Sequence, residues 1–334
     1  MTTVKIDATG FTSEPVLQRV LHDRRLPVVV TGTLLAVMFG YGSYRYSFDA
    51  QVLPNLFINN SYLIVVAVGA TFVILSGGID LSIGSLVGFS AVLTGLLVTN
   101  VRLPFALAAV IVLAVGAFGG LLMGGMIHYF RVQPFIATLA GLFLFRGLSL
   151  MLTKQSIPIN DETVASVAQY HLTLPGQTFL SVGAAVGLVM VAIAVFVLHF
   201  TRFGRQVYAI GGNEQSALLM GLPVARAKIL VYVVSGFCSA LGGLVFVLYI
   251  QSGDPRAAIG MELDAIAAVV IGGTLLTGGT GYVIGSLLGV LMIGLIKTII
   301  SSEGTFSSWW IKIFTGGLLL LFILLQRVVI TRKR

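Results

Sequence analysis

The stretch SGGIDLSIGSLVG at residues 76–88 interrupts a long apolar region and has a second copy in the chain. TGGTGYVIGSLLG at residues 277–289 repeats its pattern 201 positions later. Each copy places a glycine pair between two closely spaced apolar segments, and glycine adopts backbone conformations that a helix interior excludes. The two stretches therefore predict two helix breaks. They share identical residues at Gly77, Gly78, Ile83, Gly84, Ser85, Leu86 and Gly88.

Two interpretations of these breaks remain open from the residues alone. Irregular backbone at membrane depth is tolerated where protein or a water-filled cavity surrounds it, so both breaks could line or shape a translocation path. They could equally be tight turns between helices packed through small residues. The similarity indicates a possible internal repeat, although glycine-rich membrane segments also resemble one another by chance. The candidate residues are Gly77, Gly78, Asp80, Ser82, Gly278 and Gly279.

Composition assigns the chain to the membrane. Of its 334 residues, 57% are hydrophobic and only 10% are charged, whereas a soluble domain carries about 25% charged residues. A membrane-spanning helix needs about 20 apolar residues. We expect an all-α, polytopic membrane protein with about ten transmembrane helices, near residues 27–47, 57–76, 82–99, 104–127, 135–153, 179–200, 228–250, 262–277, 283–301 and 311–327.

The distribution of Lys and Arg predicts the orientation. With ten spans both ends lie on one side, and that side also holds the loop 201–227. Cytoplasmic loops are rich in Lys and Arg, so we expect a cytoplasmic segment 1–26, a transmembrane domain 27–327 and a cytoplasmic basic tail 328–334. The first apolar stretch lacks a clear cleavage site and is expected to be retained. The net charge of +8 thus reflects topology, not binding of nucleic acid. The cytoplasmic set is Lys5, Arg19, Arg24, Arg25, Arg131, Arg202, Arg205, Arg226, Lys228, Arg327, Arg332, Lys333 and Arg334, against Arg45, Arg102, Lys154 and Arg256 on the other side.

Several function classes are excluded or disfavoured. The chain has no GxxxxGK[ST] phosphate-binding loop and no soluble stretch long enough for an ATPase domain. Any ATP hydrolysis must come from another chain, so this one is not expected to be an enzyme. Cys238 is the single cysteine and is expected to be a small core side chain, with no metal site. Glu262, Asp264 and the four scattered histidines form no evident proton relay.

Asp80 lies at the first break, and Arg146, Lys297 and Lys312 fall inside or at the edges of spans. Asp80 could cap the helix that begins near Leu81 or pair with a basic residue. Arg146 lies about 16 Å into its span at 1.5 Å per residue, where an arginine must face protein, water or a partner. It either lies in a pathway and meets hydroxyl groups of a substrate or bonds to a carboxylate or helix-end carbonyls, and we favour the structural role.

The segment RQVYAIGGNEQSALLMGLPVARAK at residues 205–228 is a polar island between apolar stretches. Asn213 is a suitable N-cap, and the charge of Glu214 suits a helix N-terminus. Gly221 can supply a left-handed stop, and Pro223 prevents continuation. One short helix is therefore expected, with Ala217, Leu218 and Met220 as its apolar face. Such a helix needs support, either from a partner or from the lipid surface and its own bundle.

Four stretches together resemble bacterial ABC sugar-importer permeases of the ribose/branched-chain amino acid superfamily. They are TFVILSGGIDLSIGSLVG, FIATLAGLFLFRG, TRFGRQVYAIGGNEQSALLMGL and DAIAAVVIGGTLLTGGTGYVIGSLLG, and they occur in the order of that family. KQSIPIN at 154–160 and GTFSSWWIKI at 304–313 are similar to the permeases of galactofuranose importers.

The resemblance implies an ABC importer permease fold and alternating access. It also implies a cytoplasmic ABC ATPase that binds ATP, a second permease subunit (a different chain or a second copy) and a periplasmic sugar-binding protein, in the bacterial inner membrane. The coupling helix that contacts the ATPase would comprise Gly212, Asn213, Glu214, Gln215, Ala217, Leu218, Met220 and Gly221. The alternatives are a secondary transporter or facilitator that works without an ATPase, and a structural or lipid-binding membrane subunit.

Overall fold

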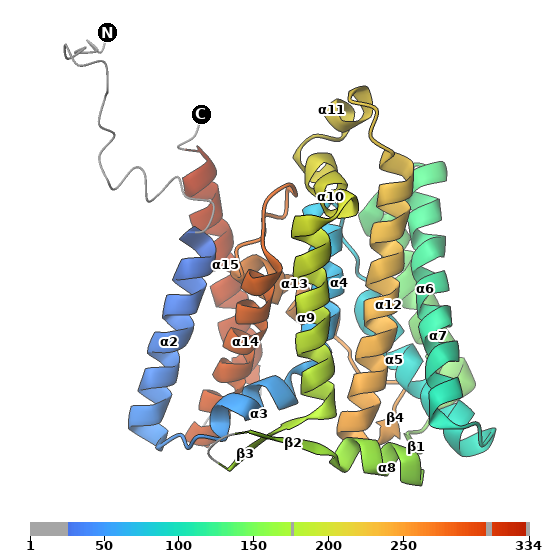
Figure 1. Ribbon diagram of the computed structural model, residues 1–334, viewed down its shortest axis with the longest axis vertical. Coiled ribbons are helices and arrows are strands. Elements are labelled where there is room, and N and C mark those ends of the chain that lie inside the picture. Colours follow the sequence, from blue (N-terminus) through green and yellow to red (C-terminus); the bar gives the residue numbers. More distant parts are fainter. Residues whose placement is uncertain (1–25, 175–176, 305–308, 332–334) are drawn as a thin grey trace.

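The computed structural model describes residues 26–174, 177–304 and 309–331, and it is a bundle of helices with two small pairs of strands (Figure 1). Of the expected segment 1–26 only Leu26 lies in the part described, whereas residues 328–331 of the expected tail 328–334 continue α15. The helices are α2 (Leu26–Tyr46), α3 (Val52–Asn59), α4 (Ser61–Leu75), α5 (Ile83–Gly95) with a π-helical turn η1 (Leu96–Asn100), α6 (Phe105–Tyr129), α7 (Pro134–Leu152), α8 (Glu162–Gln169), α9 (Val182–Phe200), α10 (Arg202–Gly212), α11 (Glu214–Leu219), α12 (Val224–Ile250), α13 (Met261–Ile271), α14 (Val283–Glu303) and α15 (Trp309–Thr331).

The chain is an all-α, multi-pass membrane protein. Among the described residues, seven helices are long and apolar enough to span a membrane, and α3 with α4, bent by 59°, could form an eighth span. One expected span differs in form, because the segment 262–277 contains only the 11-residue α13. The expected span 311–327 lies within the 23-residue α15. The count of ten spans therefore stays a prediction.

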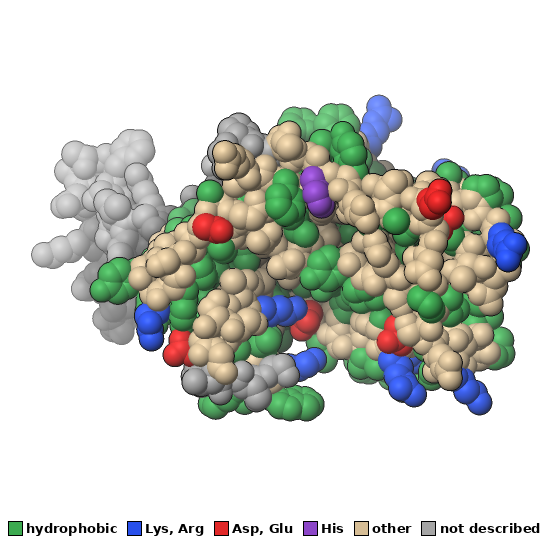
Figure 2. Space-filling model, turned by 90° about the horizontal axis from the view of Figure 1, so that it is seen from below, with side chains coloured by type: hydrophobic (Ala, Val, Ile, Leu, Met, Phe, Trp, Pro, Cys, Tyr) green, Lys and Arg blue, Asp and Glu red, His purple; other side chains and the backbone are tan. Residues whose placement is uncertain are grey.

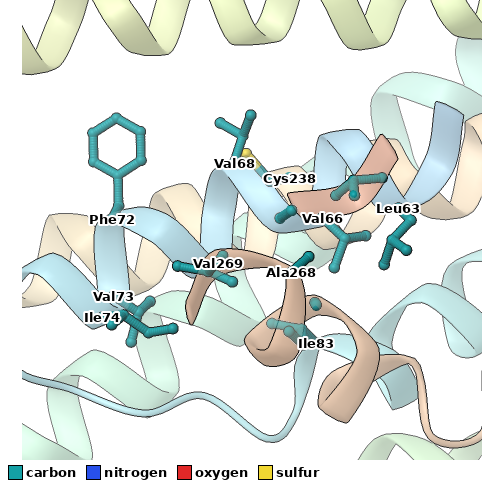
Figure 3. Close-up of a cluster of buried hydrophobic side chains, with 14 of the residues drawn as sticks. Leu63, Val66, Val68, Phe72, Val73, Ile74, Ile83, Cys238, Ala268 and Val269 are labelled. Carbon is teal, nitrogen blue, oxygen red and sulfur yellow. The ribbon is translucent and has the colours of Figure 1, made fainter. Parts of the chain in front are cut away.

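The core is centred on α4, which is buried along nearly its whole length. The larger helix α12 packs against α4, α5 and α6. Gly236 of α12 lies so close to α6 that a Cβ there would stand 2.9 Å from the Gly120 nitrogen, because small residues let helix backbones approach in a membrane. Figure 3 shows side chains of α4, α12 and α13 converging in this core, among them Cys238, which is fully buried as expected.

The two ends of the bundle differ. One, the α11 end, carries α10 and α11, and the start of α2 and the end of α15 lie at the same end (Figure 1). The other, the hairpin end, carries α3, α8 and the strands. There β1 (Ile157–Pro158) pairs with β4 (Ser252–Gly253), and β2 (His171–Leu174) pairs with β3 (Thr178–Ser181), both antiparallel. The segment 154–178 is thus partly ordered by β1, α8 and β2.

Candidate functional site

The polar island forms two helices, not the single one expected. Thr201 caps the start of α10, because its hydroxyl accepts a hydrogen bond from the Gly204 nitrogen at 3.2 Å. The second helix, α11, begins as predicted: the side chain of Asn213 accepts from the Ser216 nitrogen at 2.8 Å. The helix α10 was not predicted, although a threonine before an amphipathic stretch is a recognised signal for the start of a helix.

The end of α11 is equally well defined. Gly221 has a φ of +74°, which a residue with a side chain rarely adopts. Its nitrogen donates to the Leu218 carbonyl at 2.9 Å, and the Leu222 nitrogen donates to the Ala217 carbonyl at 3.1 Å. These two bonds are the Schellman pattern of a helix C-terminus. The predicted glycine stop is confirmed, and α11 has hydrogen-bonded caps at both ends.

The apolar face of α11 differs from the one expected. Ala217 is fully buried and packs against Ile210, Val224 and Ala227. The exposed apolar side chains are Leu218 at 58%, Leu219 at 90% and Met220 at 68% exposure. Leu219 was not predicted as part of the exposed apolar face. The adjacent leucines at 218–219 could have indicated it, since adjacent helix positions face different directions and one of the two was therefore expected away from the core. We call Leu218, Leu219 and Met220 the α11 tip.

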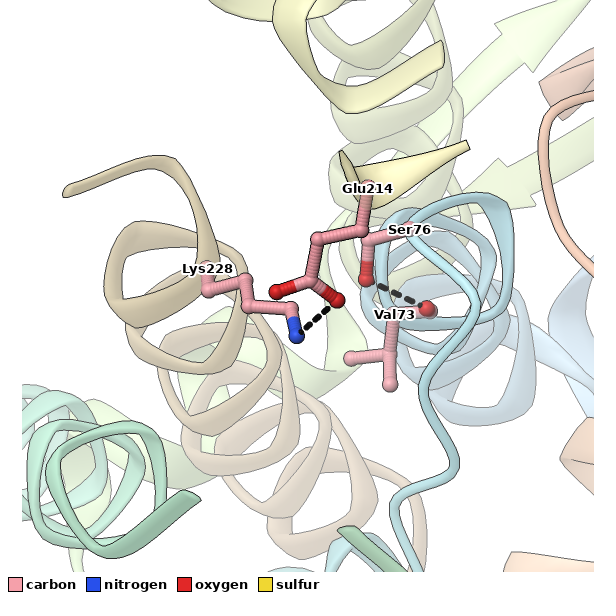
Figure 4. Close-up of polar contacts among 4 residues, drawn as sticks. All are labelled: Val73, Ser76, Glu214 and Lys228. Atoms are coloured by element: carbon pink, nitrogen blue, oxygen red, sulfur yellow. Dashed lines mark hydrogen bonds and ion pairs between the residues drawn. The ribbon is translucent and has the colours of Figure 1, made fainter. Parts of the chain in front are cut away.

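An ion pair holds α11 against α12. The Glu214 carboxylate and the Lys228 ammonium are 2.6 Å apart, and the two side chains face each other across the gap between their helices (Figure 4). The pair is partly solvated, and such pairs contribute less than about 1 kcal/mol. Its effect is positional: it orients α11 relative to the first turn of a long membrane helix.

The two helix breaks meet each other, and α10 ends against both. The Gly279 nitrogen donates to the Leu75 carbonyl at 2.9 Å, which joins the second break to the end of α4. A Cβ at Gly211 would strike that same carbonyl and would stand 2.5 Å from the Gly279 nitrogen. A Cβ at Gly278 would stand 2.7 Å from the Gly77 nitrogen. We call Gly77, Gly211, Gly278 and Gly279 the glycine junction: a Cβ at any of the last three would clash with backbone atoms, and Gly77 has a φ of +79°.

Tyr208 adds a second link between α10 and the second break. Its hydroxyl donates to the Gly281 carbonyl at 2.9 Å. Burial raises the pKa of Tyr208 to about 12, so the hydroxyl stays protonated and able to donate at physiological pH. Tyr208 and Gly211 were not predicted as site residues, because neither belongs to a recognisable local motif.

A cavity of about 370 Å³ lies between the polar island and the first break. Its walls include Gly77 and Gly78 of the break, Glu214 of α11, and Lys228 and Tyr232 of α12. Gly78 is needed here, since a Cβ at this position would stand 2.5 Å from the Tyr232 hydroxyl. The two groups of residues that the sequence predicted separately, the coupling helix and the first break, thus share one site.

Asp80 lies in the first break, before α5. Its Oδ1 accepts from the Ser82 nitrogen at 2.9 Å and from the Ser82 hydroxyl at 2.6 Å, and its Oδ2 accepts from the Ser235 hydroxyl of α12 at 2.7 Å. In the part of the chain that the structure describes, no basic side chain forms a salt bridge with it. The N-cap of α5 is Ser82 and no side chain caps this helix, so Asp80 neither caps it nor pairs with a base. Instead it holds Ser82 and ties the first break to α12.

Arg146 of α7 holds a loop. Its Nη1 donates to the carbonyls of Pro255 and Ala257, each at 2.8 Å. These carbonyls precede α13, so the arginine bonds to loop carbonyls and not to helix-end carbonyls. A Cβ at Gly88 would stand 3.2 Å from Nη1. The structure thus does not bring Arg146 to the glycine junction or to the cavity at the α11 end.

The described residues contain no group of three His, Cys, Asp or Glu side chains placed to hold a metal ion. What the site can do is mechanical: a displacement of α11 or α10 acts on the ends of α4 and of the second break through backbone contacts. Since packed interfaces respond to such shifts by changing between discrete arrangements, the geometry suits transmission of movement.

Comparisons with known proteins agree on one family. The family described as branched-chain amino acid transport system / permease component matches residues 52–323. The inner membrane ABC transporter permease protein YjfF of Escherichia coli K12 is 44% identical over 306 residues, which cover 91% of this chain and 92% of the relative. The fructose import permease protein FruG of Bifidobacterium longum is 40% identical, with 89% and 88% covered. The ribose import permease protein RbsC of Haemophilus influenzae is 36% identical, with 86% and 88% covered.

No solved structure matches the chain significantly. The family match covers both helix breaks, α10, α11 and most of the helical bundle. The chain therefore belongs to the family of permease components of branched-chain amino acid transport systems, and it is a transport subunit, not an enzyme.

Proposed function

We propose that this chain is the permease subunit of an ABC importer that moves a neutral monosaccharide across the bacterial inner membrane. The observation that carries the proposal is α11. It is a six-residue helix capped at both ends, and it holds three large apolar side chains in solvent beyond the bundle (Figure 1). Three adjacent exposed apolar side chains on a rigid, projecting element indicate a protein contact.

The partner at this contact is a separate ABC ATPase on the cytoplasmic face. The Glu214–Lys228 pair and the packing of Ala217 fix the base of α11 on the bundle, so the tip is presented and not folded back. A helix lying on the lipid surface would turn its apolar side chains toward the bundle's flank, whereas α11 stands past the end of α12 in Figure 1. This arrangement favours docking into an ATPase over attachment to lipid.

Alternating access follows from the route that the site provides. Movement of α11 is transmitted to α12 by the ion pair and through α10 to the glycine junction. Both helix breaks would then shift together, since the Leu75–Gly279 hydrogen bond joins them. The central path lies at the interface with a second permease, which is either a different chain or a second copy. A shift of this kind requires that the partner binds the two states with different affinity.

The remaining topology is proposed on the same basis. Both termini lie in the cytoplasm, with ten spans in all and α13 and α15 as the two beyond the eight candidates. The two breaks mark equivalent places in two halves of the chain. The hairpin end then faces the periplasm, where the segment 154–178 receives the sugar-binding protein.

The substrate class is supported by the relatives, whose names specify fructose, ribose and L-arabinose import. Galactofuranose is the best single candidate, on the similarity of KQSIPIN at 154–160 and GTFSSWWIKI at 304–313 to permeases of that sugar. Of these, residues 305–308 lie outside the described part, whereas β1 places Ile157 and Pro158 at the hairpin end. There they would contact the binding protein more readily than the sugar.

Reconstitution tests the proposal. The chain is purified in mild detergent from its own host, and the co-purifying proteins are reconstituted in liposomes with the sugar-binding protein outside. We expect an ATPase to co-purify and radiolabelled sugar to accumulate only with ATP inside. Accumulation without an ATPase would favour a secondary transporter and contradict the proposal. Exchanging residues 154–178 for those of a ribose permease should weaken uptake by lowering affinity for the cognate binding protein.

A further inference from the structure

A second cavity, of about 450 Å³, opens at the hairpin end, away from the glycine junction. It lies between the start of α4, the end of α12 and the part of α14 nearest that end. The side chains that give it chemical character are Asn59, Asn60, Tyr62, Tyr249, Lys297 and Ser301. Figure 2 views this face of the molecule and shows an indentation beside which a basic and an acidic side chain lie next to each other.

Asn60 is fixed at the wall of the cavity. It is 4% exposed, and its Nδ2 donates to the Leu56 carbonyl at 2.8 Å. Gly294 of α14 makes space for it, because a Cβ there would stand 3.0 Å from the Asn60 Cγ and closer still to the amide nitrogen. No described residue donates to the Asn60 Oδ1. A buried amide held in place with one acceptor free is suited to bind a ligand hydroxyl.

An ion pair lies inside the membrane-spanning part at the edge of this cavity. The Lys297 Nζ and the Asp264 Oδ2 are 3.7 Å apart, and the side chains are 35% and 32% exposed. A pair buried for structure alone would be closed and shielded, since charges within a membrane are costly. This one is long, and of its two members Lys297 lines the cavity. It therefore offers a cationic donor whose charge the neighbouring Asp264 balances.

Two aromatic rings complete the cavity. The ring centroids of Tyr62 and Tyr249 are 5.9 Å apart, with 47° between the planes. Tyr249 is 47% exposed, and its hydroxyl is 3.5 Å from the Asn59 Oδ1. Ligand pockets of ~300–1,000 Å³ that combine aromatic faces with a few placed polar groups are typical of small-molecule sites. Aromatic faces pack against C–H groups, while the amides, hydroxyls and ion pair satisfy polar groups.

We propose that this cavity binds the transported monosaccharide after its release from the binding protein, with Asn60 and Lys297 bonding its hydroxyls and Tyr249 packing on its ring. This inference rests on the proposed function. A neutral polyhydroxylated ligand fits, because donors and acceptors are mixed and the one lysine is paired. An anionic substrate would require unpaired cations, and the lysine's carboxylate partner would repel it.

Cysteine protection tests the site directly. Ser301 is exposed in the cavity, and the one native cysteine, Cys238, is fully buried. Ser301→Cys is made in a Cys238→Ala background, and labelling by a membrane-impermeant maleimide is timed with and without D-galactose, D-ribose, L-arabinose and D-fructose. Gln155→Cys, exposed at the same end but outside the cavity, is the control. For a sugar of millimolar Kd, ~10 mM occupies about nine tenths of the sites and slows labelling about tenfold.

Uptake through the complete transporter distinguishes failure of the sugar-binding cavity from failure of the proposed transport function. We expect Tyr249→Ala to raise the KM for uptake about fivefold to tenfold at unchanged kcat, whereas Tyr44→Ala, at a tyrosine 90% exposed on α2, leaves both constants unchanged. ATP-dependent uptake of a sugar that neither protects Ser301→Cys nor depends on Tyr249 would overturn the inference and leave the proposed function standing. Absence of both uptake and protection for every sugar would overturn both.

Discussion

Replacing Gly211 with alanine tests whether the glycine junction transmits movement. A methyl group at this position would strike the Leu75 carbonyl and lie 2.5 Å from the Gly279 nitrogen. Ordinary contact distances begin near 3.5 Å, so this methyl group requires a separation of about 1 Å from the Gly279 nitrogen and a larger one from the Leu75 carbonyl. Both neighbours are backbone atoms that cannot rotate away, and the 2.9 Å bond between them would break.

The expected cost is the sum of two effects. Overpacking of a tight core costs about 1–3 kcal/mol, and a buried backbone donor without its acceptor costs about 1–3 kcal/mol. We expect Gly211→Ala to lower the free energy of unfolding by roughly 3 kcal/mol. If about half of this strain, near 1.4 kcal/mol, differs between the two transport states, their populations shift about tenfold.

The neighbouring glycine is a matched control. A Cβ at Gly212 would meet nothing within 4 Å, so Gly212→Ala should leave stability unchanged. Thermal unfolding of each purified variant in detergent measures stability, and sugar uptake per ATP hydrolysed in proteoliposomes measures transport. If Gly211→Ala behaves like Gly212→Ala in both assays, the junction is not a tight contact and the reasoning is wrong.

Three further results are expected. Leu219→Ala should leave the fold intact, because the side chain is 90% exposed. It should weaken binding of the ATPase by about 2 kcal/mol, or roughly 30-fold. Pull-down titrations measure this affinity, with Leu53→Ala at the hairpin end as the inert control. Tyr208→Phe should lower the rate of sugar uptake while changing the free energy of unfolding little, since it removes the hydrogen bond from α10 to the Gly281 carbonyl. Uptake equal to that of the unaltered protein would show that this hydrogen bond does not transmit movement. A reporter active only in the periplasm, fused after Arg334, should be silent, and a strong signal would indicate an odd number of spans.

Much of the candidate site could be predicted because its signals are local. The start and the stop of α11 depend on Asn213 and Gly221, each of which acts on backbone groups within a few residues. The breaks at Gly77 and Gly278 were recognised for the same reason, as both glycines have a positive φ. Asp80 also acts locally in part, through Ser82.

The errors concern residues whose role depends on distant neighbours. Ala217 was assigned to the exposed face of α11 but is buried against Ile210 and Val224. Leu219 was overlooked, since the direction of a six-residue helix is decided by what its base packs on. For Arg146, bonding to carbonyls agrees with the structural role that was favoured, but these carbonyls lie more than 100 positions away along the chain, in a loop and not at a helix end.

The sequence by itself determined that the chain is a multi-pass helical membrane protein, where its helices break and where its exposed short helix begins and ends. These features follow from hydrophobicity and from backbone preferences, which act over one or two helical turns. Only the tertiary structure decided that Gly211 lies between the two breaks, that Tyr208 bonds to the second break, and that Lys297 and Asp264 meet beside a polar cavity. Such contacts join backbones and side chains from helices far apart in sequence, so they arise from packing and leave no periodic pattern in any one segment.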